Sequence, residues 1–316
     1  MSTRDVRLGA SWTWRQRVKN DVLWALASAV LATVRPLPRS ILLRLGRALG
    51  LFAYAIASGP RGTALANVAR VYPRNDASDG KALVRRCFVT AGEGLGETVA
   101  SMQCGRLSPP PIPLSEEART VLGAALAEGR GVVFASAHLG PWERVAASLV
   151  AAGVPLVVLA RESYDPRFSR LFERLRVANG VPSIWRARPG AAAGILRTLR
   201  SGRVLGVPMD LRTRTTSCDA PFLGHDAPTA VGPARIALRL GAPVVVGTAA
   251  PGHSGANPAT PFVITATRIA ASDLTCDDNG SRILTGRIND ELSRRILAMP
   301  HAWVWMHERW TKQSGV

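Results

Sequence analysis

The sequence has few cysteines, and their spacing does not fit a metal site or a disulfide framework. Cys87, Cys104, Cys218 and Cys276 are scattered over 316 residues without a Cys-x-x-Cys pair, so we expect ordinary thiols in a reducing compartment. Charged residues are also sparse, at 20%, whereas hydrophobic residues reach 47%. This composition excludes a disordered or acidic solvating chain and provides enough apolar surface for a sizeable core.

Several catalytic and binding motifs are missing. The chain has no G-x-x-x-x-G-K-S/T phosphate loop, no G-x-S-x-G nucleophile elbow and no H-E-x-x-H zinc motif. Gly92, Gly94 and Gly96 have the wrong spacing for a dinucleotide-binding loop, and no predicted strand precedes them. The histidines other than His138 are too dispersed to propose a metal cluster. These absences favour an enzyme that uses no metal, no nucleotide and no other cofactor.

Lysine is almost absent, whereas arginine is abundant. Of the 40 basic residues only Lys19, Lys81 and Lys312 are lysines, and 22 acidic residues leave a formal net charge of +18. Arginine makes forked contacts with phosphate and carboxylate groups, so we expect polyanionic partners. No helix-turn-helix pattern or aromatic-interleaved basic stripe is present, so the charge indicates an anionic membrane or phosphorylated substrates rather than nucleic acid.

From about residue 117 onward, short apolar segments alternate regularly with helical patterns. The alternation predicts an α/β fold with a mostly parallel sheet flanked by helices on both faces. Strands are expected at 131–137, 154–160, 181–185, 204–209, 243–248 and 262–269. Helices are expected at 81–102, 117–128, 141–152, 166–178, 190–201, 229–240 and 282–299, with a turn at 67–73.

The N-terminal segment departs from this pattern. The apolar run 22–34 follows two tryptophans and several basic residues, and an Arg-Pro pair ends it. A membrane-spanning helix needs about 20 apolar residues, so the run predicts an interfacial anchor or a marginal span, with a buried core helix as the alternative. It lacks the small residues of a signal-peptide cleavage site. A second apolar stretch, 41–58, contains two arginines.

These features predict three segments. Residues 1–58 are expected to form membrane-anchoring helices, 59–113 a helical region that ends in the proline-rich connector 109–113, and 114–316 the α/β body. A single domain over 59–316 is the alternative. The body contains no further membrane-length run, so we expect it in the cytoplasm.

Ligands of open parallel sheets bind at the carboxyl ends of the strands, and one such end is His138–Glu143, with the sequence HLGPWE. The histidine leaves the strand, Gly140 permits a tight turn and Pro141 begins a helix. Glu143 then lies in the first helical turn, within reach of the imidazole. We predict that His138 is a general base and that Glu143 accepts a hydrogen bond from one ring nitrogen.

A second strand end carries Asp210, followed by Arg212. We expect both residues to belong to the substrate-binding region. Asp210 is expected to orient an arginine rather than to take part in the chemistry.

The HLGPWE block is an HX4E motif and resembles that of the bacterial lipid A late acyltransferases, the lauroyl and myristoyl transferases. Other blocks, in the same order as in the family, extend the resemblance over most of the chain. They are Asn67–Pro73, Glu97, Arg161 with Asp165–Pro166, Arg174 with Arg176 and Gly180, Leu199–Gly202, Met209–Asp210, Pro221–Gly224 with Thr229 and Gly232, and Pro300–Arg309.

The resemblance implies an acyltransferase of lipopolysaccharide biosynthesis. Acyl carrier protein, or acyl-CoA, would supply a fatty acyl chain to a hydroxyl of a lipid A precursor, with His138 as the base and Glu143 holding its ring. Arg161 and Arg176 are candidates to hold an acceptor phosphate or the oxyanion. The expected location is the inner membrane, with the body on the cytoplasmic side, and the expected acceptor is an anionic lipid at the membrane surface.

Two alternatives remain open. A lysophospholipid or glycolipid O-acyltransferase, acting for example on a phosphatidylinositol mannoside-like lipid, would keep His138 and Glu143 but take another acceptor. A basic membrane-binding module without enzymatic activity would explain the charge and the N-terminal tryptophans, but not the placement of the HX4E motif.

Overall fold

The computed structural model describes residues 12–74, 76–103, 108–213, 215–252 and 261–310, so Cys104 and His253 lie outside the described residues. The helices are α1 (Trp14–Val34), α2 (Arg39–Ile56), α3 (Ser58–Val71), α4 (Ala77–Ala100), α5 (Glu116–Ala127), α6 (Trp142–Ala151), α7 (Pro166–Ala178), α8 (Ala191–Arg200), α9 (Gly232–Leu240) and α10 (Asp278–Ala298), followed by the short 3-10 helix η3 (Pro300–Ala302). The strands are β1 (Val132–Ser136), β2 (Leu156–Ala160), β3 (Ser183–Trp185), β4 (Val204–Pro208), β5 (Ser217–Phe222), β6 (His225–Ala230), β7 (Val244–Pro251) and β8 (Phe262–Ile269).

The described strands form a central six-stranded sheet in the order β3-β2-β4-β1-β7-β8 and a separate β5–β6 hairpin. Neighbouring strands of the central sheet are parallel except β7 and β8, which are antiparallel. β1 and β4 are aligned so that Ser136, the last residue of β1, lies opposite Pro208, the last residue of β4. The prediction of an α/β fold with a mostly parallel sheet is confirmed.

Alternate residues of β1 belong to two hydrophobic cores, one on each face of the sheet. Val133 and Ala135 pack into a core that includes side chains of α3, α4, α8, α9 and α10. Val132 and Phe134 pack into the other core, with side chains of α5 and α6. Because both faces are covered, the strands consist of nearly continuous apolar residues, which is the pattern that made them recognisable in the sequence.

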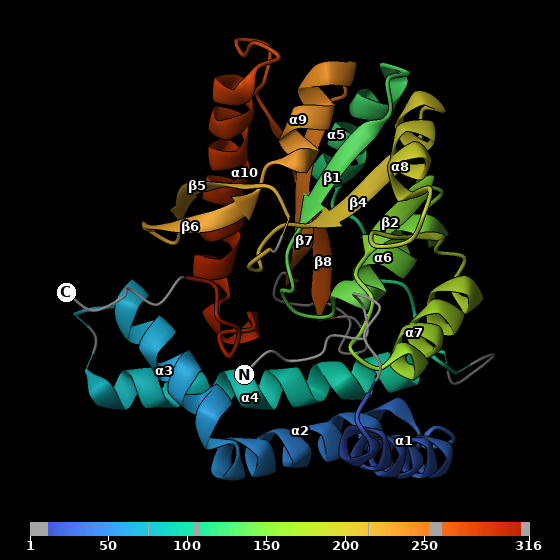
Figure 1. The fold of residues 1–316 in the computed structure, drawn as a ribbon, viewed down its shortest axis with the longest axis vertical. Helices are drawn as coiled ribbons and strands as arrows, with labels where there is room; N and C mark the ends of the chain where they lie inside the picture. The colour runs from blue at the N-terminus through green and yellow to red at the C-terminus, as the bar shows by residue number, and fades with distance from the viewer. Residues whose placement is uncertain (1–11, 75, 104–107, 214, 253–260, 311–316) are drawn as a thin grey trace.

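Helices α1, α2 and α4 form a layer at the end of the sheet toward which β1 points (Figure 1). Within this layer α2 lies directly on α4. A Cβ atom at Gly46 of α2 would overlap the backbone carbonyl of Gly92 on α4, and one at Gly92 would overlap the carbonyl of Gly46. The absence of side chains at these positions therefore permits the close approach of the two helices. Gly92, Gly94 and Gly96 lie within α4 and form no nucleotide-binding loop.

A buried carboxylate connects this layer to the body. Glu97 of α4 accepts a hydrogen bond from Arg144 of α6 at 3.0 Å and others from Arg39 of α2, one of them from Nε at 3.1 Å. Arg144 also donates to the carbonyl of Pro110 in the predicted connector at 2.7 Å. α2, α4, α6 and the connector are thus held together by one charged cluster.

Three local expectations differ from the structure. Residues 67–71, expected in a turn, belong to α3, where the buried Asn67 side chain donates to the carbonyls of Trp305 and His307. Residues 229–230, expected in a helix, end β6. The β5–β6 hairpin was not predicted. Its turn depends on Leu223, whose φ of 51° is rare for any residue other than glycine.

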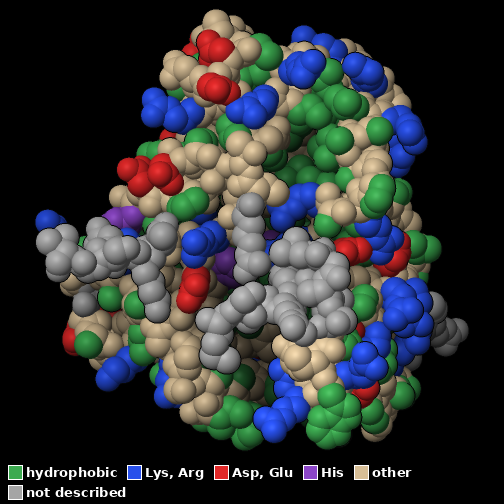
Figure 2. All heavy atoms as spheres, viewed as in Figure 1, with side chains coloured by type: hydrophobic (Ala, Val, Ile, Leu, Met, Phe, Trp, Pro, Cys, Tyr) green, Lys and Arg blue, Asp and Glu red, His purple; other side chains and the backbone are tan. Residues whose placement is uncertain are grey.

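The N-terminal helices expose rows of large hydrophobic side chains. Figure 2 shows hydrophobic side chains at the lower edge of the molecule, where α1 and α2 lie in Figure 1. The row on α1 consists of Trp14, Val18, Val22, Leu26 and Val30, and that on α2 of Ile41, Leu45, Leu49, Phe52 and Ile56, with exposed fractions from 39% to 76%. The alternative of a buried core helix is therefore wrong for α1.

Within the described part of the chain, no helix alone has the length and hydropathy needed to cross a bilayer. α2 and α3 reach these criteria only when they are taken together, and the chain bends by 89° between them.

Candidate active site

His138 lies two residues beyond the end of β1, at the carboxyl edge of the sheet. The chain then turns through Gly140, whose φ of 60° lies in the left-handed region that favours glycine, and α6 begins at Trp142. The predicted strand–turn–helix arrangement is confirmed, with Pro141 one residue before the helix. The His138 side chain is 27% exposed, so substrate can reach it from outside.

Asp210 holds the imidazole of His138. β4 pairs with β1, and Asp210 lies two residues beyond the end of β4 as His138 does beyond β1. The distance from Asp210 Oδ1 to His138 Nδ1 is 2.9 Å, and Oδ2 accepts from the His138 backbone N–H at 2.9 Å. Because a carboxylate can only accept, Nδ1 carries the hydrogen and Nε2 is left free to take a proton.

The indole of Trp303 fixes Asp210 from the other side. Its Nε1 donates to Asp210 Oδ2 at 2.9 Å. The residue before it is joined to the turn that follows His138, since Gly140 N donates to the carbonyl of Ala302 at 3.0 Å. Trp303 is itself packed against Trp305, with ring centroids 4.9 Å apart. Asp210 is completely buried and accepts three hydrogen bonds, so its position is set by its surroundings.

These contacts shift the pKa of both partners in opposite directions. Burial opposes ionisation of Asp210, but the positive charge of His138 and the three hydrogen bonds outweigh it, so the pKa of Asp210 lies below its usual value. Burial also lowers the pKa of His138, but the Asp210 carboxylate and, more weakly, Glu143 outweigh it, so the net effect raises the pKa. His138 therefore binds a proton more strongly than a free imidazole does.

Glu143 lies in the first turn of α6, as predicted, but its partner is Arg176 of α7. Glu143 Oε1 accepts from Arg176 Nη2 at 2.6 Å, and Oε2 accepts from Arg176 Nε at 3.0 Å. The predicted hydrogen bond between Glu143 and His138 is not formed in the described structure, because Asp210 occupies the ring nitrogen that faces the protein. The expectation that Asp210 orients an arginine is corrected in the same way: Asp210 orients the histidine.

Arg176 is close enough to His138 for its charge to lower the pKa of the ring. Its Nη1 atom is buried and has no hydrogen-bond partner among the described residues. The forked contact with Glu143 uses the other edge of the guanidinium, so this nitrogen keeps an unused hydrogen-bond donor.

The two remaining predicted arginines are on neighbouring loops of the same edge. Arg161 directly follows β2 and lies near His307, whose pKa is lowered mainly by burial and only slightly by the charge of Arg161. Arg212 is exposed on the loop that follows Asp210. The structure therefore brings His138, Asp210, Glu143 and Arg176 into one cluster, with Arg161 and Arg212 at the ends of adjacent strands.

Sequence reasoning missed two residues of the site, Trp303 and His307. His307 has a buried Nδ1 atom without a partner in the described part of the chain, and its pKa, lowered mainly by burial, also responds to Asp210 and His138. Both residues belong to the block Pro300–Arg309 that carried part of the family resemblance, but no spacing rule connects this block to His138. Among the described residues, no group of three or more His, Cys, Asp or Glu side chains is placed to hold a metal ion.

Fold and site together define an α/β enzyme with a histidine–aspartate pair at the carboxyl edge of its sheet. The family model of the bacterial lipid A biosynthesis acyltransferases matches residues 12–312, so the chain belongs to this family and is an acyltransferase. The resemblance seen in the separate sequence blocks is thereby confirmed over nearly the whole chain. No protein in the curated set that was searched matches the chain.

Proposed function

We propose that this acyltransferase moves a fatty acyl chain from acyl carrier protein to a hydroxyl group of a lipid A precursor, with His138 as the general base. The observation that carries the proposal is the hydrogen bond between Asp210 and His138 Nδ1. It places the free electron pair on Nε2, the ring nitrogen on the opposite side from Asp210.

The reaction needs no covalent enzyme intermediate. The acceptor hydroxyl oxygen attacks the thioester carbonyl carbon while its proton passes to His138 Nε2. The negative charge of Asp210 stabilises the imidazolium ion that forms. When the tetrahedral intermediate collapses, the carbon–sulfur bond breaks and the imidazolium returns the proton to the departing thiolate. Such base catalysis contributes about 10²–10⁴-fold to the rate.

Arg176 is the group best placed to bind negative charge beside His138. Its unpartnered Nη1 can donate to an acceptor phosphate or to the oxyanion of the tetrahedral intermediate. Glu143 contributes by fixing the guanidinium through two hydrogen bonds and by favouring the cationic form of His138. In this proposal Glu143 acts mainly through Arg176, so it is a positioning residue.

The net charge supports an acidic donor and an anionic acceptor. A formal charge of +18 attracts both an acidic carrier protein and a phosphorylated lipid. Figure 2 shows basic side chains near histidine close to the middle of the visible face, with acidic side chains beside them. An acyl-CoA donor remains the alternative, because the thioester chemistry is the same.

We also propose that α1 and α2 rest on the inner membrane, with the catalytic body on the cytoplasmic side. The two hydrophobic rows described above support contact with lipid, since apolar rows on helices with basic residues beside them are typical of interfacial helices. An enzyme held in this way meets a membrane-bound acceptor without extracting it from the bilayer.

The test is acyl transfer by the purified full-length chain in lipid vesicles. Acyl carrier protein and CoA donors are each offered with a lipid A precursor, a lysophospholipid and a glycolipid as acceptors. We expect transfer from the carrier protein to the lipid A precursor. Faster acylation of the lysophospholipid or the glycolipid would contradict the proposed acceptor.

His138→Ala and Glu143→Ala are measured in the same assay. We expect His138→Ala to abolish transfer, whereas Glu143→Ala leaves a reduced rate because it does not touch the reacting proton. Circular dichroism confirms that each variant folds. If folded His138→Ala retains more than a few per cent of the activity, His138 is not the base.

A further inference from the structure

Two adjoining cavities lie between α1 and α7, on the face of α7 opposite Arg176. One has a volume of about 700 Å³ and extends along α7, and the other has a volume of about 440 Å³ and extends along α1 to Arg35 and Met102. Trp24, Arg174 and Ala178 line both cavities. The two are therefore one continuous space, called here the α1–α7 groove.

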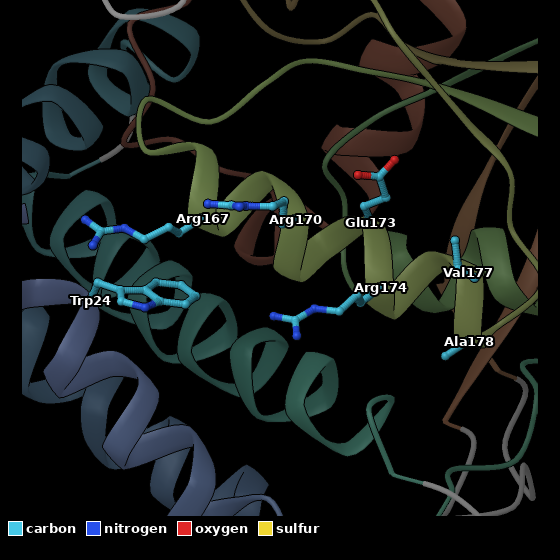
Figure 3. Close-up of a pocket in the computed structure, with 7 residues that line it drawn as sticks. All are labelled: Trp24, Arg167, Arg170, Glu173, Arg174, Val177 and Ala178. Carbon is cyan, nitrogen blue, oxygen red and sulfur yellow. The ribbon is translucent and has the colours of Figure 1, made fainter. Parts of the chain in front are cut away.

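The groove has a charged rim. Arg170 and Arg174 lie one turn apart on α7 and are exposed, and no ion pair or hydrogen bond engages either side chain in the described part of the molecule. Figure 3 shows the Arg174 side chain reaching from α7 toward the Trp24 ring, whereas Glu173 points away from it. Glu173 is engaged elsewhere, since it accepts a hydrogen bond from Trp185 Nε1 at 3.1 Å.

Arg167, at the other end of the rim, differs from these two arginines. It is paired with Asp165 and with Asp21 of α1, both at 2.7 Å, and its guanidinium lies 5.6 Å from the ring centroid of Trp24. These contacts join α7 to α1 at one end of the groove. Arg170 lies close enough to Asp165 for its charge to lower the pKa of that carboxyl, but neither Arg170 nor Arg174 forms such a pair among the described residues, so both can bind an anionic ligand.

The rest of the lining is mainly apolar. Trp24, Leu31, Leu171 and Leu175 form its floor, together with the alkyl part of Arg174. Trp24 also packs edge-on against Phe168, with ring centroids 5.2 Å apart. A ligand that fits this lining has a hydrophobic chain and an anionic group at one end.

The position of α1 identifies the source of such a ligand. Trp24 and Leu31 are on the inner side of α1, while the exposed row that includes Val22, Leu26 and Val30 is on the other. A helix that rests on a bilayer through its outer side places the groove at the level of the lipid headgroups.

We propose that the α1–α7 groove binds one anionic glycerophospholipid, with its phosphate on Arg170 and Arg174 and an acyl chain along Trp24 and Leu31. This site goes beyond the proposed function, because no residue of the His138 cluster lines it and its lipid is neither donor nor acceptor. The lipid fills the space between α1 and the body and joins the membrane-facing helix to α7.

The experiment is native mass spectrometry of the full-length chain in detergent, with phosphatidylglycerol or phosphatidylcholine of the same acyl chains added. We expect one retained phosphatidylglycerol per chain and little phosphatidylcholine. The paired variant Arg170→Gln with Arg174→Gln is expected to bind phosphatidylglycerol about thirtyfold more weakly. The matched control, Arg197→Gln with Arg200→Gln, removes two exposed arginines from α8 and is expected to bind like the unmodified chain.

Three outcomes overturn the proposal. They are unchanged binding by the Arg170 and Arg174 pair, an equal loss in the α8 pair, and equal retention of phosphatidylcholine. The variant His138→Ala separates the two proposals. Its acyl-transfer rate tests the proposed function, whereas its binding of phosphatidylglycerol tests only the groove and should be unchanged.

A second readout locates the acyl chain and does not depend on the arginine variants. Phosphatidylglycerol with brominated chains quenches tryptophan fluorescence on contact, and Trp24→Phe keeps an aromatic ring against Phe168. We expect part of the quenching seen in the unmodified chain to be missing in this variant. Identical quenching in the two proteins would place the chain outside the groove.

Discussion

One hydrogen bond determines which nitrogen of His138 can act as a base. Asp210 occupies Nδ1 and raises the pKa of the ring, and only the neutral ring can accept a proton. Activity should therefore increase as the pH rises through the pKa of His138, with a midpoint above the ordinary value of 6.5. In the proposed mechanism, this contact makes His138 a stronger base and shifts the pH range of activity upward.

Asp210→Asn tests this linkage. Removal of the negative charge lowers the pKa of His138, so the acid side of the kcat/KM profile is expected to move to lower pH. The maximal rate should fall by about 10²–10⁴-fold, because the imidazolium loses its counter-charge and the tautomer is no longer fixed. The profile is measured with saturating acceptor. Asp219→Asn, at an exposed position on β5, serves as the control and should leave the midpoint unchanged. A midpoint that stays in place in Asp210→Asn would exclude the contact as the cause of the raised pKa.

At the scale of elements, the contact between α2 and α4 depends on glycine at particular positions. Gly92→Ala would force its new methyl group against the Gly46 carbonyl, and overpacking of this kind typically destabilises a protein by about 1–3 kcal/mol. Gly94, two residues along the same helix, has no atom within 4 Å of the corresponding position. Gly94→Ala should therefore stabilise the protein by up to about 1 kcal/mol through helix propensity alone. Thermal unfolding measures both variants: the unfolding temperature should fall in Gly92→Ala and rise in Gly94→Ala. If it shifted in the same direction in both, α2 and α4 would not be packed this closely.

The exposed hydrophobic rows of α1 and α2 lead to a second prediction at this scale, which concerns membrane binding. Leu49→Glu combined with Phe52→Glu places two charges on the outer side of α2, and Leu26→Glu with Val30→Glu does the same on α1. All four positions are at least 48% exposed, so folding should be little affected. Each lost apolar contact with lipid is worth about 1.5–3 kcal/mol, so the fourfold variant should no longer float with anionic vesicles. Leu297→Glu, at an exposed position on α10, is the control. Undiminished flotation of the fourfold variant would show that the membrane contact lies elsewhere.

The sequence predicted most elements of the body within three residues of their ends, because buried parallel strands are continuous apolar runs and the helices between them are amphipathic. It placed His138 at the end of its strand for the same reason. The pairing of His138 with Asp210 could not be predicted in this way. It depends on β4 lying next to β1, although 72 residues separate the two side chains. Glu143, five residues from His138, was the only nearby carboxylate along the chain, and its capture by Arg176 is again a contact between distant segments.

At the scale of the whole molecule, the net charge of +18 predicts how the donor arrives. Attraction between an acidic carrier protein and an arginine-rich surface weakens as salt shortens the screening length to about 8 Å at physiological ionic strength. We expect kcat/KM for the carrier-protein donor to fall steeply between low salt and roughly 0.3 M. Acyl-CoA, with its smaller charged surface, should show a shallower decrease or much lower activity throughout. The acceptor is kept saturating so that only donor binding varies. A flat profile for the carrier protein, with faster turnover of acyl-CoA, would favour the CoA donor.

The charged cluster around Glu97 has a geometric consequence for the choice of acceptor. Arg39 of α2 and Arg144 of α6 bind the same carboxylate, and Arg144 is the immediate neighbour of Glu143. If α2 rests on a bilayer as proposed, the contacts from Arg39 through Glu97 to Arg144 fix the distance between His138 and the lipid surface. A hydroxyl group can react only if its own headgroup carries it to that distance from the surface. The length of the headgroup therefore becomes a selection criterion, independent of its charge or its sugar chemistry.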